Sequence, residues 1–355
     1  MKILITGNMG YIGPGVVRHL RSTYPKAALV GLDTGFFAHC LTNVNVFPEA
    51  RVDVQYFHDI RDVTPAMVRG VDYVVNLAAI SNDIMGSIDE SITLDVNCRA
   101  GVRLARLAKA AGTRGFVFAS SCSIYGFAAD GARTETSPVD PLTAYARSKV
   151  LTEKALAPLA DKRFKITCLR FATACGFSER LRLDLVLNDF VAGAVATKKI
   201  TILSDGTPWR PLINVRDMAR AIEWAIARKP SAGGPFLIVN AGANEWNFQV
   251  RDLAHAVARV IPGVEVSVNK DAPPDKRSYR VSFDLFKKLA PDHQPQVSLD
   301  QTIRELKEGL EAMNFRDANY RESNFIRLKV LSRLKERGLA SERFSWNRVP
   351  SGAPG

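Results

Sequence analysis

Short apolar runs alternate with longer amphipathic stretches over the first half of the chain. The runs have strand length and are rich in Val, Ile, Leu and Phe: Lys2–Thr6, Ala28–Leu32, Tyr73–Leu77, Phe116–Ala119 and Ile166–Phe171. Two stretches between them, Ser91–Ala111 and Ala144–Leu159, have helical periodicity. Alternation of this kind predicts an α/β fold, a doubly wound parallel sheet with helices on both faces. Ligands of such sheets bind at the carboxyl ends of the strands.

The pattern becomes less regular after Phe171. Further helices are expected over Leu185–Thr197, Asp217–Arg228 and Val250–Val260, and further strands over Ile200–Leu203, Phe236–Asn240 and Tyr279–Phe283. We therefore expect a Rossmann-type domain over residues 1–172, onto which parts of 212–242 fold back. Residues 173–315 are expected to form a smaller C-terminal α/β lobe that binds the substrate.

The last part of the chain has a pattern of its own. Asn324–Arg337 places Phe and Leu near helical spacing, with Arg and Lys between them. Residues 316–348 are therefore expected to form a basic amphipathic helical tail. We expect the tail to pack against the protein's own lobe or a second subunit rather than a membrane. Residues 349–355 are rich in Pro, Gly and Ser and are expected to be disordered.

Composition narrows the class of protein. The chain is 46% hydrophobic and 24% charged, as is typical of soluble globular proteins. Its net charge of +12 is spread along the sequence without a nucleic-acid recognition motif, and a basic surface also suits a substrate that carries a diphosphate. The sequence has neither a transmembrane-length apolar stretch nor a signal-peptide pattern. Five cysteines without metal-type spacing indicate a reduced, cytoplasmic protein with no metal site.

A glycine-rich turn follows the first predicted strand. The run Gly7-Asn8-Met9-Gly10-Tyr11-Ile12-Gly13 opens a helix that extends toward Leu20. Glycines let the backbone turn tightly and approach a pyrophosphate at a helix N-terminus. The spacing is G-x-x-G-x-x-G rather than the common G-x-G-x-x-G, and a plain strand-to-helix turn is the alternative. The strand and helix around the run favour a dinucleotide-binding loop.

Asp33 ends the second predicted strand, about twenty residues beyond the glycine turn. A carboxylate at this point accepts the adenosine ribose hydroxyls and repels the 2′-phosphate of NADP. The residues that follow, Thr34-Gly35-Phe36-Phe37, include no cation. The sequence therefore predicts NAD as the cofactor, with a solvated strand end as the alternative role of Asp33.

Hydroxyl groups and a Tyr-Lys pair supply candidate chemistry. The run Ser120-Ser121-Cys122-Ser123 follows a predicted strand, and Tyr145 and Lys149 lie four residues apart on a predicted helix. Residues four apart share one helix face, so the phenol and the ammonium lie side by side. The ammonium and a nicotinamide cation both favour the phenolate, which lowers the pKa of Tyr145 toward the range of a working base. A surface Tyr and Lys is the alternative.

These segments resemble the extended short-chain dehydrogenase/reductase family, in particular its NAD-dependent nucleotide-sugar epimerase and dehydratase branch. The resemblance rests on Thr6–Gly13, Asp59-Ile60, Asn76-Leu77-Ala78-Ala79, Asn97, Ser121–Gly126, Tyr145–Lys149, Arg170-Phe171 and the segment from Asp205 to Asp217. Residues 316–355 fall outside it. The resemblance implies a homodimer that acts on a nucleotide-diphosphate sugar.

The resemblance also implies roles for single residues. The expected cofactor-binding residues beyond the glycine turn and Asp33 are Asp59, Ile60, Leu77, Ala78, Ala79, Asn97, Tyr145 and Lys149. The expected substrate-binding residues are Ser81, Ser121, Ser123, Thr173, Asn188, Arg210 and Arg277. Arg210 matches an arginine that the family directs at the diphosphate, and Arg280 is an alternative to Arg277 as the second phosphate ligand.

The residues after Ser121 bear on the reaction. By resemblance, hexose dehydratases carry two carboxylates where this chain has Cys122 and Ser123. We expect Cys122 to be a small packed residue. The Ser-x-Ser pattern resembles the 4-epimerases, in which Tyr145 would take the proton of the sugar 4-hydroxyl while Ser121 and Ser123 bind the sugar. A transient 4-keto sugar would then be reduced on its other face, without net redox change.

Other outcomes remain open. A nucleotide-sugar dehydratase or a 4-keto-sugar reductase would use the same fold, and a non-catalytic NAD-binding regulatory protein is an alternative of another class. Thr173 stands where the hexose 4-epimerases carry Asn, so the sugar pocket differs from theirs. The charged run Arg180-Leu181-Arg182-Leu183-Asp184 either addresses an acidic or unusual sugar or forms a solvated loop.

Overall fold

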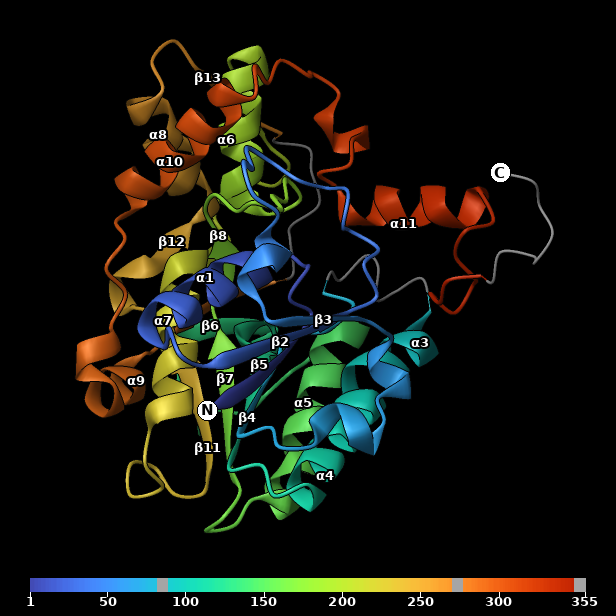
Figure 1. Cartoon of the computed structure of the whole chain (residues 1–355). Coiled ribbons are helices and arrows are strands. Elements are labelled where there is room, and N and C mark those ends of the chain that lie inside the picture. The colour runs from blue at the N-terminus through green and yellow to red at the C-terminus, as the bar shows by residue number, and fades with distance from the viewer. Residues whose placement is uncertain (82–88, 270–276, 348–355) are drawn as a thin grey trace, which may run out of the picture.

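The computed structural model describes residues 1–81, 89–269 and 277–347. Its centre is a seven-stranded sheet in the order β11-β7-β5-β4-β1-β2-β3, paired in parallel throughout (Figure 1). The strands are β1 (Lys2–Thr6), β2 (Ala28–Asp33), β3 (Val54–Phe57), β4 (Tyr73–Asn76), β5 (Gly115–Ser121), β7 (Lys165–Phe171) and β11 (Phe236–Ala241). The predicted doubly wound Rossmann-type fold is confirmed.

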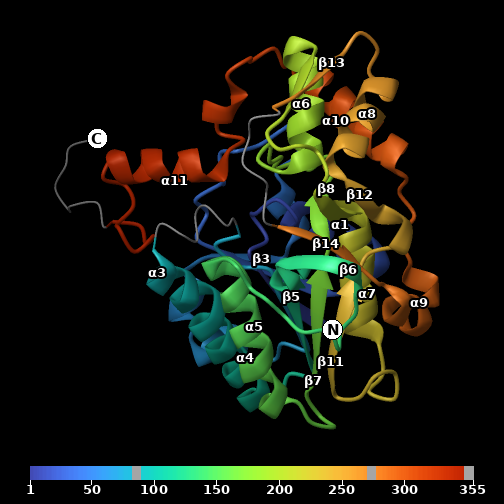
Figure 2. The ribbon, with the colours of Figure 1, turned by 180° about the vertical axis from the view of Figure 1, so that it is seen from behind.

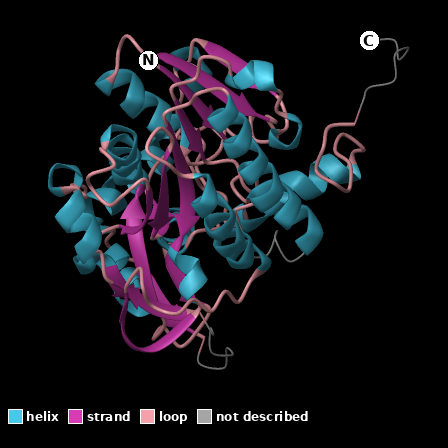
Figure 3. Cartoon of the chain, turned by 90° about the horizontal axis from the view of Figure 1, so that it is seen from below, coloured by secondary structure: helices cyan, strands magenta, loops and turns pink. Residues whose placement is uncertain are grey.

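Helices cover both faces of this sheet, and the view from below shows strands between layers of helices (Figure 3). On one face α1 (Gly13–Thr23) packs against α7 (Val215–Ala227), and on the other α4 (Ala100–Ala110) packs against α5 (Ala144–Leu156). Alternate residues of a strand point to opposite faces. Accordingly Ile3 and Ile5 join the core beneath α1 and α7, whereas Leu4 joins the core beneath α4.

Two details of the central sheet and its covering helices differ from the predicted elements. The strand β3 was not predicted, because it lies at the edge of the sheet and none of its four residues is buried. The predicted helix Ser91–Ala111 is divided into α3 (Glu90–Leu94), a wider π-helical turn over Asp95–Arg99, and α4. This turn carries Asn97, whose side chain is buried.

The smaller lobe contains three short sheets. Their strands are β6 (Phe127–Arg133), β8 (Thr173–Cys175), β9 (Lys199–Ile202), β10 (Trp209–Asn214), β12 (Asn247–Gln249), β13 (Glu265–Val268) and β14 (Ser278–Val281). The strand β10 pairs with both β8 and β12, and β13 pairs with β9. The third sheet consists of β14 and β6, and Figure 2 shows these two strands side by side. The lobe's helices are α6 (Val186–Thr197), α8 (Val250–Val260), α9 (Asp284–Leu289) and α10 (Leu299–Ala312).

The chain crosses between these parts more than once. After β10 it returns through α7 to the central sheet, where β11 pairs with β7. It then re-enters the lobe and finally leaves it after α10. The last helix, α11 (Arg327–Glu336), stands apart from the lobe's helices, near the segment after β2 (Figure 1).

The amphipathic pattern of the tail corresponds to a buried contact with the N-terminal domain. Three apolar residues of α11 pack against Phe36, Cys40, Ile80 and Ile92: Val330, Leu331 and Leu334. In the part of the chain that the structure describes, every helix is too short or too polar to cross a bilayer. The segment 349–355, expected to be disordered, lies outside the described residues.

Candidate active site

A cavity of about 920 Å³ lies at the carboxyl ends of the central strands and is lined by residues of both the sheet and the smaller lobe. This volume is at the upper end of the range found for ligand pockets. Most of the predicted site residues line it: Gly7, Gly10, Tyr11, Ile12, Asp33, Asp59, Ile60, Leu77, Ala78, Ala79, Ser81, Ser121, Ser123, Tyr145, Lys149, Thr173, Arg210 and Arg277. The fold thus brings together residues that the sequence separates by up to 270 positions.

The glycine turn presents backbone to this cavity. Gly7 has a φ of +73°, and a Cβ there would lie 2.6 Å from the backbone nitrogen of Ala78. At Gly13, the first residue of α1, a Cβ would lie 2.1 Å from the carbonyl oxygen of Asn8. Only glycine fits at these two positions. Asn8 and Met9 are buried instead of lining the cavity, and the Asn8 amide donates to Oε1 of Gln55 at 2.7 Å.

Asp33 closes the loop against the end of β2. Its Oδ2 accepts the backbone N–H of Met9 at 3.1 Å, and its Oδ1 accepts that of Gly35 at 2.8 Å. Burial raises the pKa of Asp33, and the two N–H donors oppose that rise because they stabilise the charged form. The glycine turn, the acceptor carboxylate and the cation-free segment after it fit NAD.

The catalytic candidates face the other end of the same cavity. Ser121 Oγ donates to Ser123 Oγ at 2.9 Å and accepts the backbone N–H of Ser123 at 3.1 Å. The ammonium of Lys149 donates to the carbonyl of Ala119 at 2.7 Å and lies 5.3 Å from the centre of the Tyr145 ring. Lys149 is only 3% exposed, and burial lowers the pKa of its ammonium to about 8.

Asn97 lies behind this wall, not in it. Its Oδ1 accepts the backbone N–H of Ile80 at 2.8 Å, and its Nδ2 donates to the carbonyl of Ile80 and to Ser148 Oγ. Ser148 is on α5, next to Lys149 in sequence. The amide therefore fastens the segment after β4 to the helix that carries Tyr145.

Asn188 is likewise fully buried and does not line the cavity. Its Oδ1 accepts the backbone N–H of Gly176, and its Nδ2 donates to the Tyr11 hydroxyl and to the carbonyl of Arg182. The Tyr11 hydroxyl donates to the carbonyl of Gly176 at 2.6 Å. In this structure Asn188 therefore positions the loop around Arg182.

The charged run in that loop is not solvated. Of the two alternatives for this run, the prediction of a solvated loop was therefore wrong. Arg180 is 1% exposed and forms a two-point ion pair with Glu49 at 2.7 and 3.0 Å. Arg182 lines the cavity, donates to both carboxylate oxygens of Asp184 at 2.9 Å and to Ser81 Oγ at 3.0 Å. Each guanidinium thus already binds a carboxylate of the chain.

The two phosphate candidates come together at the lobe side of the cavity. Arg210 on β10 donates to the carbonyls of Trp209 and Arg277, and both arginines line the cavity. Arg280 lies instead over the Trp209 ring, 5.3 Å from its centre, and does not line the cavity. Of the two alternatives, the geometry therefore favours Arg277.

Cys122 is packed inside the protein, as predicted. Its side chain is 0% exposed, and its thiol donates to the carbonyl of Arg170 at 3.1 Å. Burial raises the pKa of this thiol well above its ordinary value.

Sequence reasoning missed the contribution of the tail, from which Ile326, Arg327, Leu331 and Phe344 also line the cavity. Among the described residues no cluster of three metal-ligating side chains occurs.

Comparison with known proteins identifies the family. Residues 3–242 match the family described as the NAD dependent epimerase/dehydratase family. The chain is 29% identical over 254 residues to an uncharacterized UDP-glucose epimerase of Bacillus subtilis (strain 168), covering 69% of this chain and 78% of that protein. It is 26% identical over 272 residues to the UDP-glucose 4-epimerase of Streptomyces lividans, covering 73% and 80%.

Solved structures share the fold. A UDP-glucuronic acid 4-epimerase from Bacillus cereus, in complex with UDP-glucuronic acid and NAD, superposes with a TM-score of 0.75 at 22% identity, covering 88% of this chain and 100% of that one. The NAD-dependent NDP-hexosamine 5,6-dehydratase TunA gives a TM-score of 0.75 at 22% identity, covering 90% and 99%. Each of the two alignments therefore leaves about a tenth of this chain uncovered.

Proposed function

The chain belongs to the NAD-dependent epimerase/dehydratase family, and from that premise we propose that it is a nucleotide-sugar 4-epimerase. That it is an NAD-dependent enzyme of the nucleotide-sugar epimerase/dehydratase type follows from the family; the 4-epimerisation is our proposal. The observation that carries it is the paired hydroxyl groups of Ser121 and Ser123 at the Tyr145 end of the cavity, with Cys122 turned into the protein interior.

The carboxylates support this choice. Elimination of water from a sugar needs a general acid and a general base in addition to the redox step. The described carboxylates that line the cavity are Asp33, Asp59, Asp184 and Asp189. Asp184 is held by Arg182 and Asp189 by Arg321, while Asp33 and Asp59 belong to the end with the glycine turn. Ser121 and Ser123 bind a sugar without supplying an acid for elimination.

Each catalytic side chain then has a defined task. Tyr145, as phenolate, takes the proton of the sugar 4-hydroxyl, and Ser121 donates a hydrogen bond to the same oxygen. Lys149 stabilises the phenolate electrostatically and remains in place through its bond to the Ala119 carbonyl. NAD, which the glycine turn and Asp33 would hold, would supply the hydride acceptor and donor for the change at C4. Tyr145 finally gives the proton back, so that no net redox change occurs.

Between the two hydride transfers the sugar ring must rotate to present its other face, while the nucleotide stays bound. Arg210 and Arg277 are placed to hold the diphosphate, about which the sugar rotates. Arg182 and Asp184 together present a neutral ion pair to the cavity. A sugar carboxylate would have to compete with Asp184 for this guanidinium, so we propose an uncharged hexose as substrate.

The test is to incubate the purified protein with a panel of UDP-, GDP-, CDP- and dTDP-hexoses and to identify the products by NMR. We expect a C4 epimer of one hexose, formed without added NAD(H) and without a lasting change in the absorbance of reduced nicotinamide. A stoichiometric change in that absorbance would indicate a reductase, and a product that has lost water would indicate a dehydratase. Tyr145→Phe should abolish the conversion, and its failure to do so would point to a different site.

A further inference from the structure

We call the segment 320–347 the strap. It leaves the smaller lobe and runs along the cavity to the segments that follow β2 and β3 in the Rossmann-type domain. It includes α11 and five of the described residues that line the cavity: Arg321, Ile326, Arg327, Leu331 and Phe344. It lies beyond the part of the chain that resembles the epimerase/dehydratase branch in sequence. The contacts of the strap show which ligand it faces.

At its start the strap is fastened to the loop around Arg182. The backbone N–H of Leu183 donates to the carbonyl of Phe325 at 3.1 Å, and Arg327 Nη2 donates to the carbonyl of Arg180 at 2.8 Å. The Arg327 guanidinium lies 4.7 Å from the centre of the Phe37 ring. The strap thus joins this loop to the segment that follows Asp33.

Arg327 is a buried cation whose hydrogen-bond and ring partners in the described structure are two backbone carbonyls and one aromatic ring, while the carboxylate that acts on it, Asp184, is already paired with Arg182. Its side chain is 2% exposed, and burial lowers the pKa of the guanidinium to about 10, so it stays charged at neutral pH. A buried charge is costly unless an opposite charge compensates it. Because Arg327 lines the cavity that contains the glycine turn, a ligand diphosphate would supply that charge.

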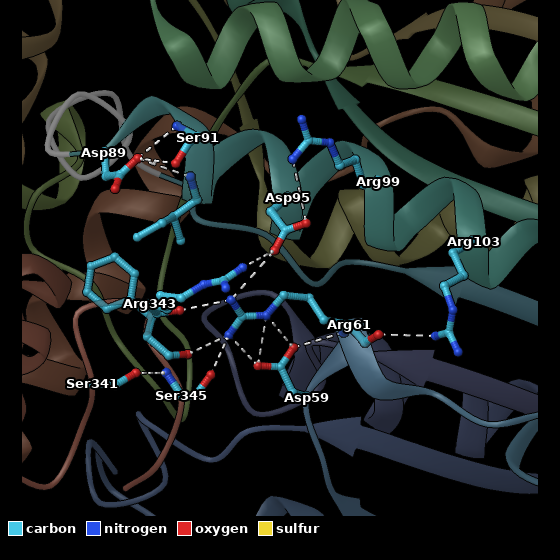
Figure 4. A network of polar contacts seen from close by, with 12 residues as sticks. Asp59, Arg61, Asp89, Ser91, Asp95, Arg99, Arg103, Ser341, Arg343 and Ser345 are labelled. Carbon is cyan, nitrogen blue, oxygen red and sulfur yellow. Dashed lines mark hydrogen bonds and ion pairs between the residues drawn. The ribbon is translucent and has the colours of Figure 1, made fainter.

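At its other end the strap is held by Arg61 (Figure 4). Asp59, at the cofactor end of the cavity, orients this guanidinium through an ion pair of 2.6 Å. The guanidinium then donates to the carbonyls of Arg343 and Phe344, at 2.9 and 3.0 Å, and to Ser345 Oγ at 2.8 Å. One side chain therefore fixes three successive residues of the strap.

Trp346 completes this attachment. Its indole N–H donates to the carbonyl of Thr34 at 2.6 Å, and its ring lies 4.6 Å from that of Phe36. Thr34 and Phe36 lie one and three positions after Asp33 and line the cavity. The strap is consequently anchored on the same short segment that carries the residue expected to bind the adenosine ribose.

We propose that the strap forms one wall of the NAD site, in which Arg327 is a counterion of the cofactor's diphosphate and the Arg61 and Trp346 contacts hold the wall closed. NAD then leaves only when these contacts open, which slows its release and keeps it bound through successive turnovers. The inference rests on NAD as cofactor and does not depend on which sugar reaction the enzyme performs.

The first experiment measures release of NAD from the full-length protein. Bound NAD is quantified by chromatography at intervals after transfer into cofactor-free buffer, with unfolding temperature as the control for folding. Trp346→Ala should release NAD about tenfold faster, from the loss of one hydrogen bond and one aromatic contact. Leu339→Ala is the matched control, because Leu339 lies on the same segment and is 45% exposed against 46% for Trp346. It should release NAD at the wild-type rate.

The second experiment tests the charge of Arg327. Arg327→Met should bind NAD about tenfold to a hundredfold more weakly, whereas Arg327→Lys should recover part of the loss. A chain that ends after Ala340 keeps α11 but lacks the Arg61 and Trp346 contacts. If Arg327→Met fails to fold, this shortened chain still tests whether the strap slows the release of NAD.

The outcomes separate this proposal from the proposed reaction. If Trp346→Ala and the shortened chain fold and release NAD at the wild-type rate, the strap proposal is overturned and the 4-epimerase proposal is untouched. If they release NAD faster but the wild-type protein forms no C4 epimer, the strap proposal stands and the proposed reaction fails.

Discussion

The two ends of the cavity are built in different ways. At the Tyr145 end, Ser121 and Ser123 come from one strand end, while Tyr145 and Lys149 come from one helix. At the Asp33 end, the walls come from segments far apart in sequence, such as Arg61 with residues 343–345. The first end is therefore a set of local motifs on rigid elements, and the second is an assembly of loops and the strap.

This difference predicts whether a substitution should change turnover or NAD binding. In the proposed reaction, side chains at the Tyr145 end take part in proton transfer, so their loss should reduce turnover while NAD stays bound. The side chains at the Asp33 end are proposed to hold the cofactor, so their loss should weaken NAD binding while turnover at saturating NAD persists. Three substitutions and a pH profile test whether the two ends of the cavity act separately.

Tyr145→Phe should have the largest effect. Removal of the hydroxyl eliminates the acid-base group, and kcat should fall by about a thousandfold or more. Bound NAD and the unfolding temperature should match the wild type, because the ring and its packing remain. Steady-state kinetics together with the NAD content of the purified protein test this. A large loss of NAD would show that the two ends are not separable.

Ser121→Ala should follow, with a loss in kcat of about a hundredfold, typical of removing one hydrogen-bond donor from a reacting oxygen. Ser123→Ala is the matched control, because its hydroxyl is the partner of Ser121 but is not assigned to the reacting oxygen. It should cost about tenfold or less by the loss of one hydrogen bond. Equal losses for the two variants would contradict the separate roles.

Asp33→Asn should act on the cofactor alone. It replaces a charged acceptor of hydrogen bonds, and NAD affinity should fall by about tenfold to a hundredfold, with weaker discrimination against NADP. Titration of NAD and NADP followed by calorimetry measures both effects. The exposed Asp62→Asn serves as a control for charge. A fall in kcat at saturating NAD would mean that Asp33 also shapes the Tyr145 end.

The pH dependence should give the smallest effect. Burial lowers the pKa of the Lys149 ammonium to about 8, so the charged form that stabilises the phenolate is present below that pH and is lost as pH rises through it. The activity should therefore decline on the alkaline side near pH 8. Lys149→Arg should move this decline to higher pH, and a decline unaltered in Lys149→Arg would assign it to another group.

The same contrast explains what the sequence could predict. The buried strands, the glycine turn, Asp33 and the Tyr145-Lys149 pair leave periodic or local patterns that the residues themselves carry. The edge strand β3 has no buried residue and leaves no such pattern. Neither do the contacts of Arg61, because a guanidinium that donates to backbone carbonyls places no demand on the side chains it meets.

Asn188 shows a further limit. The resemblance indicated a polar residue near the sugar or phosphate, but the side chain is used to tie Tyr11, Gly176 and the Arg182 carbonyl together. Arg180 also appeared to be a loop charge, because its partner Glu49 lies 131 positions away. Pairings over such distances depend on how the loops pack, which spacing along the chain does not reveal.

The return of β11 to the central sheet has a consequence for synthesis on the ribosome. The strand β7 is buried along its whole length in the finished protein, where β5 covers one edge and β11 the other. While the chain is being made, its second edge stays open until residues 236–241 emerge, and an unpaired strand edge is a site of pairing with other chains. The nascent enzyme therefore passes through an aggregation-prone interval that ends only after the first part of its smaller lobe, through β10, has been translated.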